Sequence, residues 1–206
     1  MVPFQTNRKT IIILLTMVLV LANAWLIKEN YKQTPSIAGQ SVAEIVPIPT
    51  TIDENFITQV NECFLPIATI YGYTLRITSD FRSVAEQEEL FAQGRDVEGH
   101  IVTQALPGKS IHNYGFAVDV VDRWRGFDIN WQRLGKIGTY CSLEQGDEDY
   151  DEKAHFQNRN GLTTQQFELG FRPPMLTLPC PIMHERAVTE EPLTMADLND
   201  CGAPKF

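Results

Sequence analysis

The stretch from Ser110 to Asp119 combines residue types that bind metal ions. It offers an imidazole at His112 and a carboxylate at Asp119, with Gly115 between them to permit a sharp turn. Apolar residues alternate around Asp119 as they do in a β-strand. Burying an ionised carboxylate without a partner costs several kcal/mol, so we expect Asp119 to be paired with a cation or a metal.

A second histidine, His155, follows Asp119 by 36 residues and lies three residues after Glu152. Two histidines and one aspartate make a three-ligand zinc site with an open coordination position, as in catalytic zinc sites. Glu152 is then close to the metal without being needed as a ligand, which suits a general base. The residues therefore predict one zinc ion held by His112, Asp119 and His155, with Glu152 as the base.

The segment before His155 is unusually acidic between residues 144 and 152. Asp149 and Asp151 are alternative bases, although their spacing to His155 fits less well. A solvated loop is the simplest interpretation of the acidic run. A calcium site is the sharper alternative, but the run lacks the order of ligands and glycine found in an EF-hand.

Three segments of the chain, taken in order, resemble a family of zinc peptidases. Ser-x-His-x-x-Gly-x-Ala-x-Asp followed by Glu/Asp-x-x-His-Phe is similar to the pattern of VanY-type D-alanyl-D-alanine carboxypeptidases, D-Ala-D-Ala dipeptidases and L-alanyl-D-glutamate endopeptidases of phage lysins. Residues 78–83 with Glu86 and Gln87 resemble the family's Ser-Gly-Tyr-Arg-Ser segment. Residues 134–138 resemble the helix before its last histidine, and the whole resemblance covers about residues 56–157.

The resemblance implies a fold and a role for each matching residue. The implied fold is α+β, a small antiparallel sheet with helices packed on one side and the zinc at its open face, as in hedgehog-like D-Ala-D-Ala peptidases. Residue by residue, it implies zinc binding by His112, Asp119 and His155, base catalysis by Glu152, substrate or oxyanion binding by Arg82, and substrate contacts by Ser110 and Gln87.

The implied function is a zinc peptidase acting on D-amino-acid-containing bonds of peptidoglycan stem peptides, first of all a D-Ala-D-Ala carboxypeptidase. One alternative is an L-alanyl-D-glutamate endopeptidase, including a membrane-tethered phage lysin. Another is a non-catalytic, metal-dependent cell-wall-binding module on the same fold. Glu152 and Arg82 favour the enzyme, because a binding module needs no base. The family often has tryptophan and paired glycines before His155, and proline where this chain has Ala154, so the resemblance does not fix the substrate.

The chain of 206 residues has room for one domain with appendages. It carries 17 basic and 26 acidic residues, for a formal charge of −9. Such a chain has no excess of cations with which to bind phosphates, so nucleic acid is not an expected partner.

The N-terminus has the pattern of an export signal. Arg8 and Lys9 precede the apolar residues 11–21, and Ala-Asn-Ala at 22–24 offers a signal-peptidase site. Residues 25–27 prolong the apolar run enough for an uncleaved membrane anchor, which is the alternative. In both cases the positive flank predicts that the rest of the chain lies in the periplasm or on the outer face of the cytoplasmic membrane.

The rest of the sequence predicts how the chain divides into four segments and where its helices and strands lie. The parts are a signal peptide or signal anchor (1–28), a linker rich in Pro, Ser, Thr and Gln (29–51), the zinc peptidase domain (52–172) and a C-terminal tail without clear periodicity (173–206). A helix is predicted over most of 53–70, starting at a Thr51 capping pattern and perturbed by Pro66. Two further helices are predicted, one after a Ser83–Glu86 capping box and one over 130–141. Strands are predicted at 73–78 and 116–121.

The four cysteines, an even number, fit an oxidising compartment. Cys180 and Cys201 flank a polar stretch with little core of its own, and we hypothesise a disulfide between them. For Cys63 and Cys141, two buried thiols and a second disulfide are equally acceptable interpretations.

Overall fold

The computed structural model describes residues 48–146, 152–175, 177–203 and 205. The predicted signal segment, almost all of the predicted linker, and the alternative bases Asp149 and Asp151 lie outside these residues. No helix within the described residues is long and apolar enough to cross a membrane.

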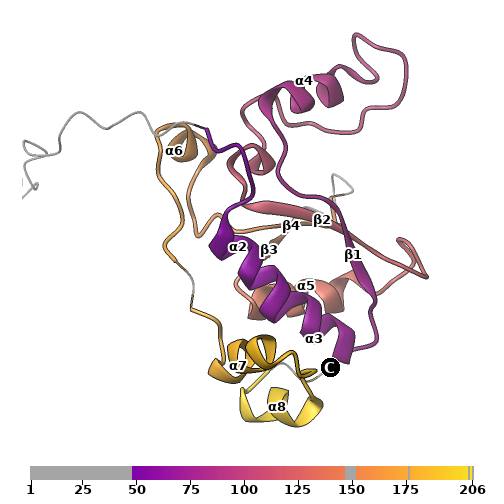
Figure 1. Cartoon of the computed structure of the whole chain (residues 1–206). Helices are drawn as coiled ribbons and strands as arrows, with labels where there is room; N and C mark the ends of the chain where they lie inside the picture. The colour runs from indigo at the N-terminus through magenta and orange to yellow at the C-terminus, as the bar shows by residue number, and fades with distance from the viewer. Residues whose placement is uncertain (1–47, 147–151, 176, 204, 206) are drawn as a thin grey trace, which may run out of the picture. The chain divides into compact units, whose positions relative to one another are not determined.

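A four-stranded antiparallel sheet forms the centre of the fold, in the order β1-β2-β4-β3 (Figure 1). The strands are β1 (Leu75–Ser79), β2 (Ala117–Asp122), β3 (Glu144–Gln145) and β4 (His155–Gln157). Strand β2 is buried along nearly its whole length because it has a partner on either side. The predicted α+β fold with a small antiparallel sheet is confirmed, and the two predicted strands are shifted by one or two residues.

Helices pack against the sheet around a single apolar core. They are α2 (Glu54–Gln59), the π-helical turn η1 (Val60–Phe64) and α3 (Leu65–Ile70), which run on as one segment, and α5 (Trp131–Tyr140). Phe64 of η1 meets Phe156 of β4 with 4.5 Å between ring centroids, and both rings are fully buried. The predicted helix over 130–141 is confirmed, with Asn130 as its N-cap.

The first helix differs from the prediction at its start. Asp53, and not Thr51, is the N-cap, because its Oδ1 accepts hydrogen bonds of 3.0 Å from the backbone N–H groups of Asn55 and Phe56. The N–H of Asp53 in turn donates to the carbonyl of Gly115. The expected perturbation by Pro66 is found as the π turn that precedes it, since proline has no N–H to continue the α-helical ladder.

Three further short helical segments lie near the sheet. These are α4 (Val84–Ala92), the 3₁₀ turn η2 (Ile111–Tyr114) and α6 (Thr164–Glu168). The predicted capping box of α4 is confirmed: Ser83 Oγ accepts from the N–H of Glu86, and the Glu86 carboxylate accepts from the N–H of Ser83 at 2.8 Å.

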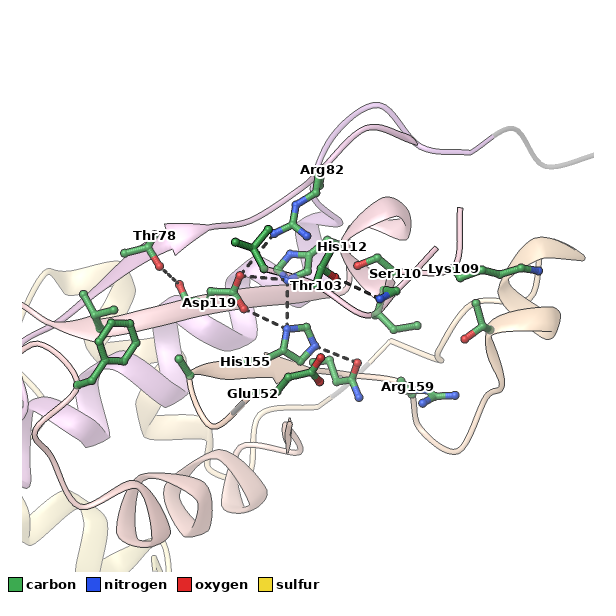
Figure 2. A pocket seen from close by; sticks show the side chains of 18 residues that line it. Thr78, Arg82, Thr103, Lys109, Ser110, His112, Asp119, Glu152, His155 and Arg159 are labelled. Carbon is green, nitrogen blue, oxygen red and sulfur yellow. Dashed lines mark hydrogen bonds and ion pairs between the residues drawn. The ribbon is translucent and has the colours of Figure 1, made fainter. Parts of the chain in front are cut away.

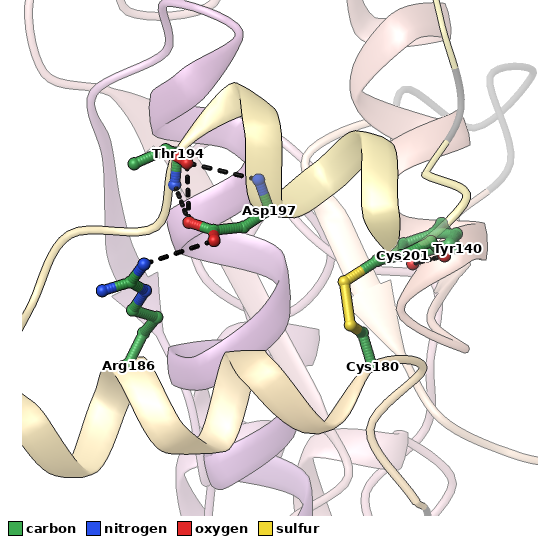
Figure 3. Close-up of a disulfide and its surroundings, with 6 residues drawn as sticks. All are labelled: Tyr140, Cys180, Arg186, Thr194, Asp197 and Cys201. Atoms are coloured by element: carbon green, nitrogen blue, oxygen red, sulfur yellow. Dashed lines mark hydrogen bonds and ion pairs between the residues drawn. A yellow bond between two sulfur atoms is a disulfide. The ribbon is translucent and has the colours of Figure 1, made fainter.

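The C-terminal segment contains two helices where no periodicity predicted any, α7 (Pro181–Thr189) and α8 (Met195–Asp200). The hypothesised disulfide between Cys180 and Cys201 is present and joins them (Figure 3). Met183 and Leu198 are buried in the core cluster, so this segment packs on the domain.

A second disulfide, between Cys63 and Cys141, ties η1 to the end of α5. The structure thus selects one of the two interpretations left open for these residues. Both cysteines are fully buried, and the bond joins positions 78 residues apart, on either side of β1 and β2 in the sequence.

The packing of α5 on β4 can be tested by adding one methyl group. An added Cβ at Gly138 would lie 2.8 Å from Cε1 of Phe156, whose ring is fixed in the core. We expect Gly138→Ala to lower the free energy of unfolding by about 1–3 kcal/mol in urea denaturation, although alanine favours helix by about 1 kcal/mol.

Gly135→Ala is the matched control on the same helix. An added Cβ there meets the flexible end of the Gln145 side chain, so we expect a smaller loss of stability or a gain. Equal destabilisation by both substitutions would contradict the expectation that overlap with the Phe156 ring is what destabilises Gly138→Ala.

Candidate metal centre

Asp119 and His155 face each other across adjacent strands. The register pairs Asp119 of β2 with His155 of β4, so both side chains project from the same face of the sheet. Nδ1 of His155 lies 3.1 Å from Oδ1 of Asp119. The pairing explains why an aspartate is tolerated in an otherwise apolar strand.

His112 reaches the same place from the turn η2. Gly115, with φ of 78°, ends this turn and lets the chain enter β2. Nε2 of His112 lies 3.1 Å from Nδ1 of His155 and 3.4 Å from Oδ2 of Asp119 (Figure 2). Ligand atoms of His112, Asp119 and His155 all lie within 4.8 Å of one another, so the structure brings together the three residues predicted to bind zinc.

The outer nitrogen of each histidine has a hydrogen-bond acceptor. Nδ1 of His112 is 2.6 Å from the carbonyl oxygen of Asp80, and Nε2 of His155 is 3.1 Å from Oε1 of Gln157. Because an oxygen acceptor requires a protonated nitrogen, each ring turns its unprotonated nitrogen toward Asp119. These are the tautomers that a metal requires, so the residues present fit a metal ion on their own geometry.

Electrostatics keep Asp119 ionised. Burial acts to raise the pKa of Asp119, but when the inward nitrogens of His112 and His155 also carry protons, the hydrogen bonds and charge of these rings hold it well below its usual range. For His155, burial acts to lower the pKa, but the hydrogen bond and the charge of Asp119 raise it above its ordinary value. Arg82 adds a full cation, with Nη2 3.6 Å from Oδ2 of Asp119, as expected for a carboxylate in this strand.

Arg82 is held in place by neighbouring side chains. Its Nη1 donates to Oε1 of Gln87 at 2.7 Å, and its Nη2 donates to Oγ of Ser79 at 3.0 Å. Burial lowers the pKa of the Arg82 guanidinium, while the charge of Asp119 opposes this effect. The result is a cation with a fixed orientation beside the candidate ligands.

Gln87 has a different position from the one that the sequence suggests. It is fully buried behind Arg82, and its amide also donates to the carbonyl of Ala105 at 2.7 Å. The residues that line the cavity over the histidines do not include it. In this structure Gln87 supports Arg82, and sequence reasoning could not distinguish that position from a substrate contact.

A cavity of about 490 Å³ opens over the three candidate ligands. Arg82, Ser110 and Glu152 line it together with them, so the structure places these three residues beside the candidate ligands. Glu152 is exposed at the cavity, and its carbonyl accepts a hydrogen bond of 2.9 Å from the N–H of His155. Sequence reasoning missed Gln157 and Arg159, which also line the cavity and follow His155 at alternate positions.

Comparison with known proteins gives a family and a relative of related activity. The model of one family, described as "VanY: D-alanyl-D-alanine carboxypeptidase", matches residues 51–167. The peptidoglycan L-alanyl-D-glutamate endopeptidase CwlK of Bacillus subtilis (strain 168) is 36% identical over 93 residues, covering 45% of this chain and 55% of that protein. The chain therefore spans about half the length of this curated relative.

Two solved structures are also similar to the chain. A mutant of the vancomycin-resistance D,D-pentapeptidase VanY from a VanB-type cassette, in complex with Zn(II), is 17% identical with a TM-score of 0.43, over 57% of this chain and 78% of that chain. The L,D-carboxypeptidase DacB from Streptococcus pneumonia is 16% identical with a TM-score of 0.44, over 59% of this chain and 78% of that chain.

The hydrogen bond from His155 to Gln157 can be tested by metal binding. We expect Gln157→Leu to weaken zinc affinity about 10–100-fold, because it removes the acceptor that fixes the tautomer of His155. Competition with a chromophoric chelator measures the affinity. Gln165→Leu, at an exposed position of α6, is the control and should bind zinc like the wild type. Unchanged affinity in Gln157→Leu would rule out this role.

The pKa values of the site predict how zinc binding depends on pH. The pKa of His155 is raised, so below that value zinc must displace a proton from the ring. Asp119 has a strongly lowered pKa and stays ionised, so it adds no pH dependence in this range. We expect zinc affinity to fall, with growing proton release, as the pH is lowered from about 8 to about 6 in calorimetric titrations. A constant affinity over this range would contradict binding through His155.

Proposed function

The chain belongs to the VanY family of D-alanyl-D-alanine carboxypeptidases, and from this premise we propose that it is a zinc-dependent peptidase of peptidoglycan stem peptides. Removal of a terminal D-alanine is the first candidate reaction. The observation that carries the proposal is the cluster of His112, Asp119 and His155 in one cavity with Arg82 and Glu152.

The donor set suits one zinc ion. Two imidazoles and a carboxylate are the usual ligands of catalytic zinc, and both rings turn an unprotonated nitrogen inward. When bound, zinc supplies Lewis acidity, which polarises a carbonyl group and acidifies water. His112, Asp119 and His155 would hold it through Nε2, the carboxylate and Nδ1, since these atoms face one another.

Three further residues can act on the substrate. The exposed carboxylate of Glu152 can take a proton from water and later give it to the leaving amine. Arg82, fixed by Ser79 and Gln87, can bind a substrate carboxylate or carbonyl with paired N–H donors. Ser110 is buried in the cavity wall, where its hydroxyl can donate to a substrate oxygen.

A second candidate activity is cleavage between L-alanine and D-glutamate. The similarity to CwlK, a peptidoglycan L-alanyl-D-glutamate endopeptidase, favours it. The two activities differ in whether the cavity admits more than one residue beyond the scissile bond. A non-catalytic wall-binding module is the third alternative, and the retained Glu152 argues against it.

We also propose that residues 1–28 export the chain and that it acts in the periplasm or on the outer face of the cytoplasmic membrane. Two disulfides support this location, because such bonds persist in oxidising compartments. Residues 52–172 would carry the peptidase and residues 29–51 would link it to the N-terminal segment, which would hold it to the membrane if uncleaved. Peptidoglycan is then the partner, and nucleic acid is not.

Product analysis tests the proposed function. Zinc-loaded full-length protein is incubated with purified muropeptides, and products are identified by mass spectrometry. Loss of a terminal D-alanine establishes a carboxypeptidase, whereas a cut between L-alanine and D-glutamate establishes an endopeptidase. We expect Glu152→Gln, with its zinc content verified, to reduce kcat about 10²–10⁴-fold through loss of the base.

Glu185→Gln, an exposed position on α7, is the matched control and should retain activity. Absence of any cleavage by folded, zinc-loaded wild type would contradict the peptidase proposal and favour the binding module. Full activity in Glu152→Gln would instead remove Glu152 from the role of base.

A further inference from the structure

Arg159 lines the cavity of the metal centre but has no part in the chemistry described above. We propose that Arg159 binds a second carboxylate of the substrate peptide, apart from the group bound by Arg82. On this proposal, which rests on the proposed peptidase function, the site selects stem peptides that carry a free carboxylate near the scissile bond.

The backbone after His155 aims Arg159 into the cavity. His155, Gln157 and Arg159 occupy alternate positions and all line it, whereas Phe156 and Asn158 between them are buried on the other side. The amide of Asn158 lies in the interior, where it donates to a buried glutamine. These buried neighbours fix the backbone on which Arg159 stands.

The guanidinium of Arg159 is oriented with donors to spare. Its Nε donates to the carbonyl of Leu162 at 2.9 Å, within a turn closed by the N–H of Leu162. Among the residues that the structure describes, neither terminal nitrogen has a hydrogen-bond or ion-pair partner. Figure 2 shows Arg159 on the far side of the two histidines from Arg82. A half-buried, pre-oriented guanidinium of this kind suits a carboxylate bound by two N–H groups.

Charge also distinguishes Arg159 from the other cations of the cavity. Arg82 is paired with Asp119, and Lys109 forms an ion pair with Glu168. Arg159 therefore contributes a positive charge with no carboxylate partner in the described parts of the chain. In a protein of net charge −9, such a local cation is what would attract an anionic group into this cavity.

Distance along the chain indicates which part of the substrate Arg159 can reach. Four residues of extended backbone separate the Cα atoms of His155 and Arg159 by at most about 13 Å. A few residues of an extended bound peptide span the same distance, so Arg159 can reach a carboxylate on a residue within a few positions of the scissile bond. In a stem peptide, γ-linked D-glutamate presents a free α-carboxylate of this kind, or a carboxamide when it is amidated.

Equilibrium binding of a matched pair of muropeptides tests the proposal. The pair differs only in D-glutamate against D-isoglutamine. Binding is measured by calorimetry to zinc-loaded, full-length Glu152→Gln protein, in which we expect turnover to be slowed, and mass spectrometry verifies that the ligand stays intact during the titration. We expect the acid to bind about tenfold more tightly than the amide, as for a hydrogen bond to a charged group. Adding Arg159→Gln should abolish this preference and leave the affinity for the amide unchanged.

Two further variants separate recognition from folding. Arg159→Lys should keep part of the preference for the acid, because it keeps the charge. Arg123→Gln removes an exposed arginine that does not line the cavity and should keep the full preference. Two results would overturn the proposal: equal affinity of the acid and the amide for the protein that retains Arg159, or an equal loss of affinity for both peptides when Arg159→Gln is added. Thermal denaturation would show whether such a loss comes from unfolding.

An assay of whether the wild type cleaves the two peptides separates the test of this proposal from the test of the proposed function. Cleavage without any dependence of binding preference on Arg159 overturns the carboxylate site and leaves the peptidase. A preference that depends on Arg159, without cleavage, supports the carboxylate site and contradicts the peptidase.

Discussion

The carboxylate of Asp119 lies on β2, an inner strand of the sheet whose neighbouring positions are apolar and buried. An ionised group at such a position is stable only with compensating donors and charges. Here it receives them from Arg82 in the loop after β1, His112 in η2 and His155 in β4. The fold and the site therefore satisfy one constraint: the chain must bring these three side chains to one carboxylate, and in doing so it assembles the candidate metal centre.

The rest of the domain holds this arrangement from behind. Phe156, next to His155, packs on Phe64 of η1, and η1 is joined to α5 by the disulfide between Cys63 and Cys141. The C-terminal helices add a further layer, since α7 packs on η1. Figure 3 shows how the second disulfide and the ion pair of Arg186 with Asp197 hold α7 and α8 together, while the hydroxyl of Tyr140 on α5 donates to the carbonyl of Cys201.

Features that depend on local spacing could be predicted from the sequence. The strand around Asp119, the Ser83–Glu86 capping box and the helix over 130–141 all follow from patterns within a few residues. The candidate ligands follow from residue types in two short segments, around His112 and around His155. Features that depend on tertiary contacts could not. The helices α7 and α8 are short, and a disulfide and a few buried side chains hold them on the domain. Asp53, and not Thr51, is the cap of α2, and its backbone N–H also donates to the carbonyl of Gly115.

The site shows the same division. The three candidate ligands were indicated by their residue types, but Gln87 and Gln157 are ordinary glutamines in the sequence. Only the fold shows that one supports Arg82 and the other orients His155. The roles of Glu152, Ser110 and Arg82 in catalysis, and the export of the chain, stay predictions.

Anomalous diffraction from crystals of the zinc-loaded protein would show whether His112, Asp119 and His155 together hold one zinc ion. We predict one zinc peak, about 2.0–2.2 Å from Nε2 of His112, Nδ1 of His155 and a carboxylate oxygen of Asp119. Zinc bound through Nε2 of His155, or no zinc among these three residues, would contradict it.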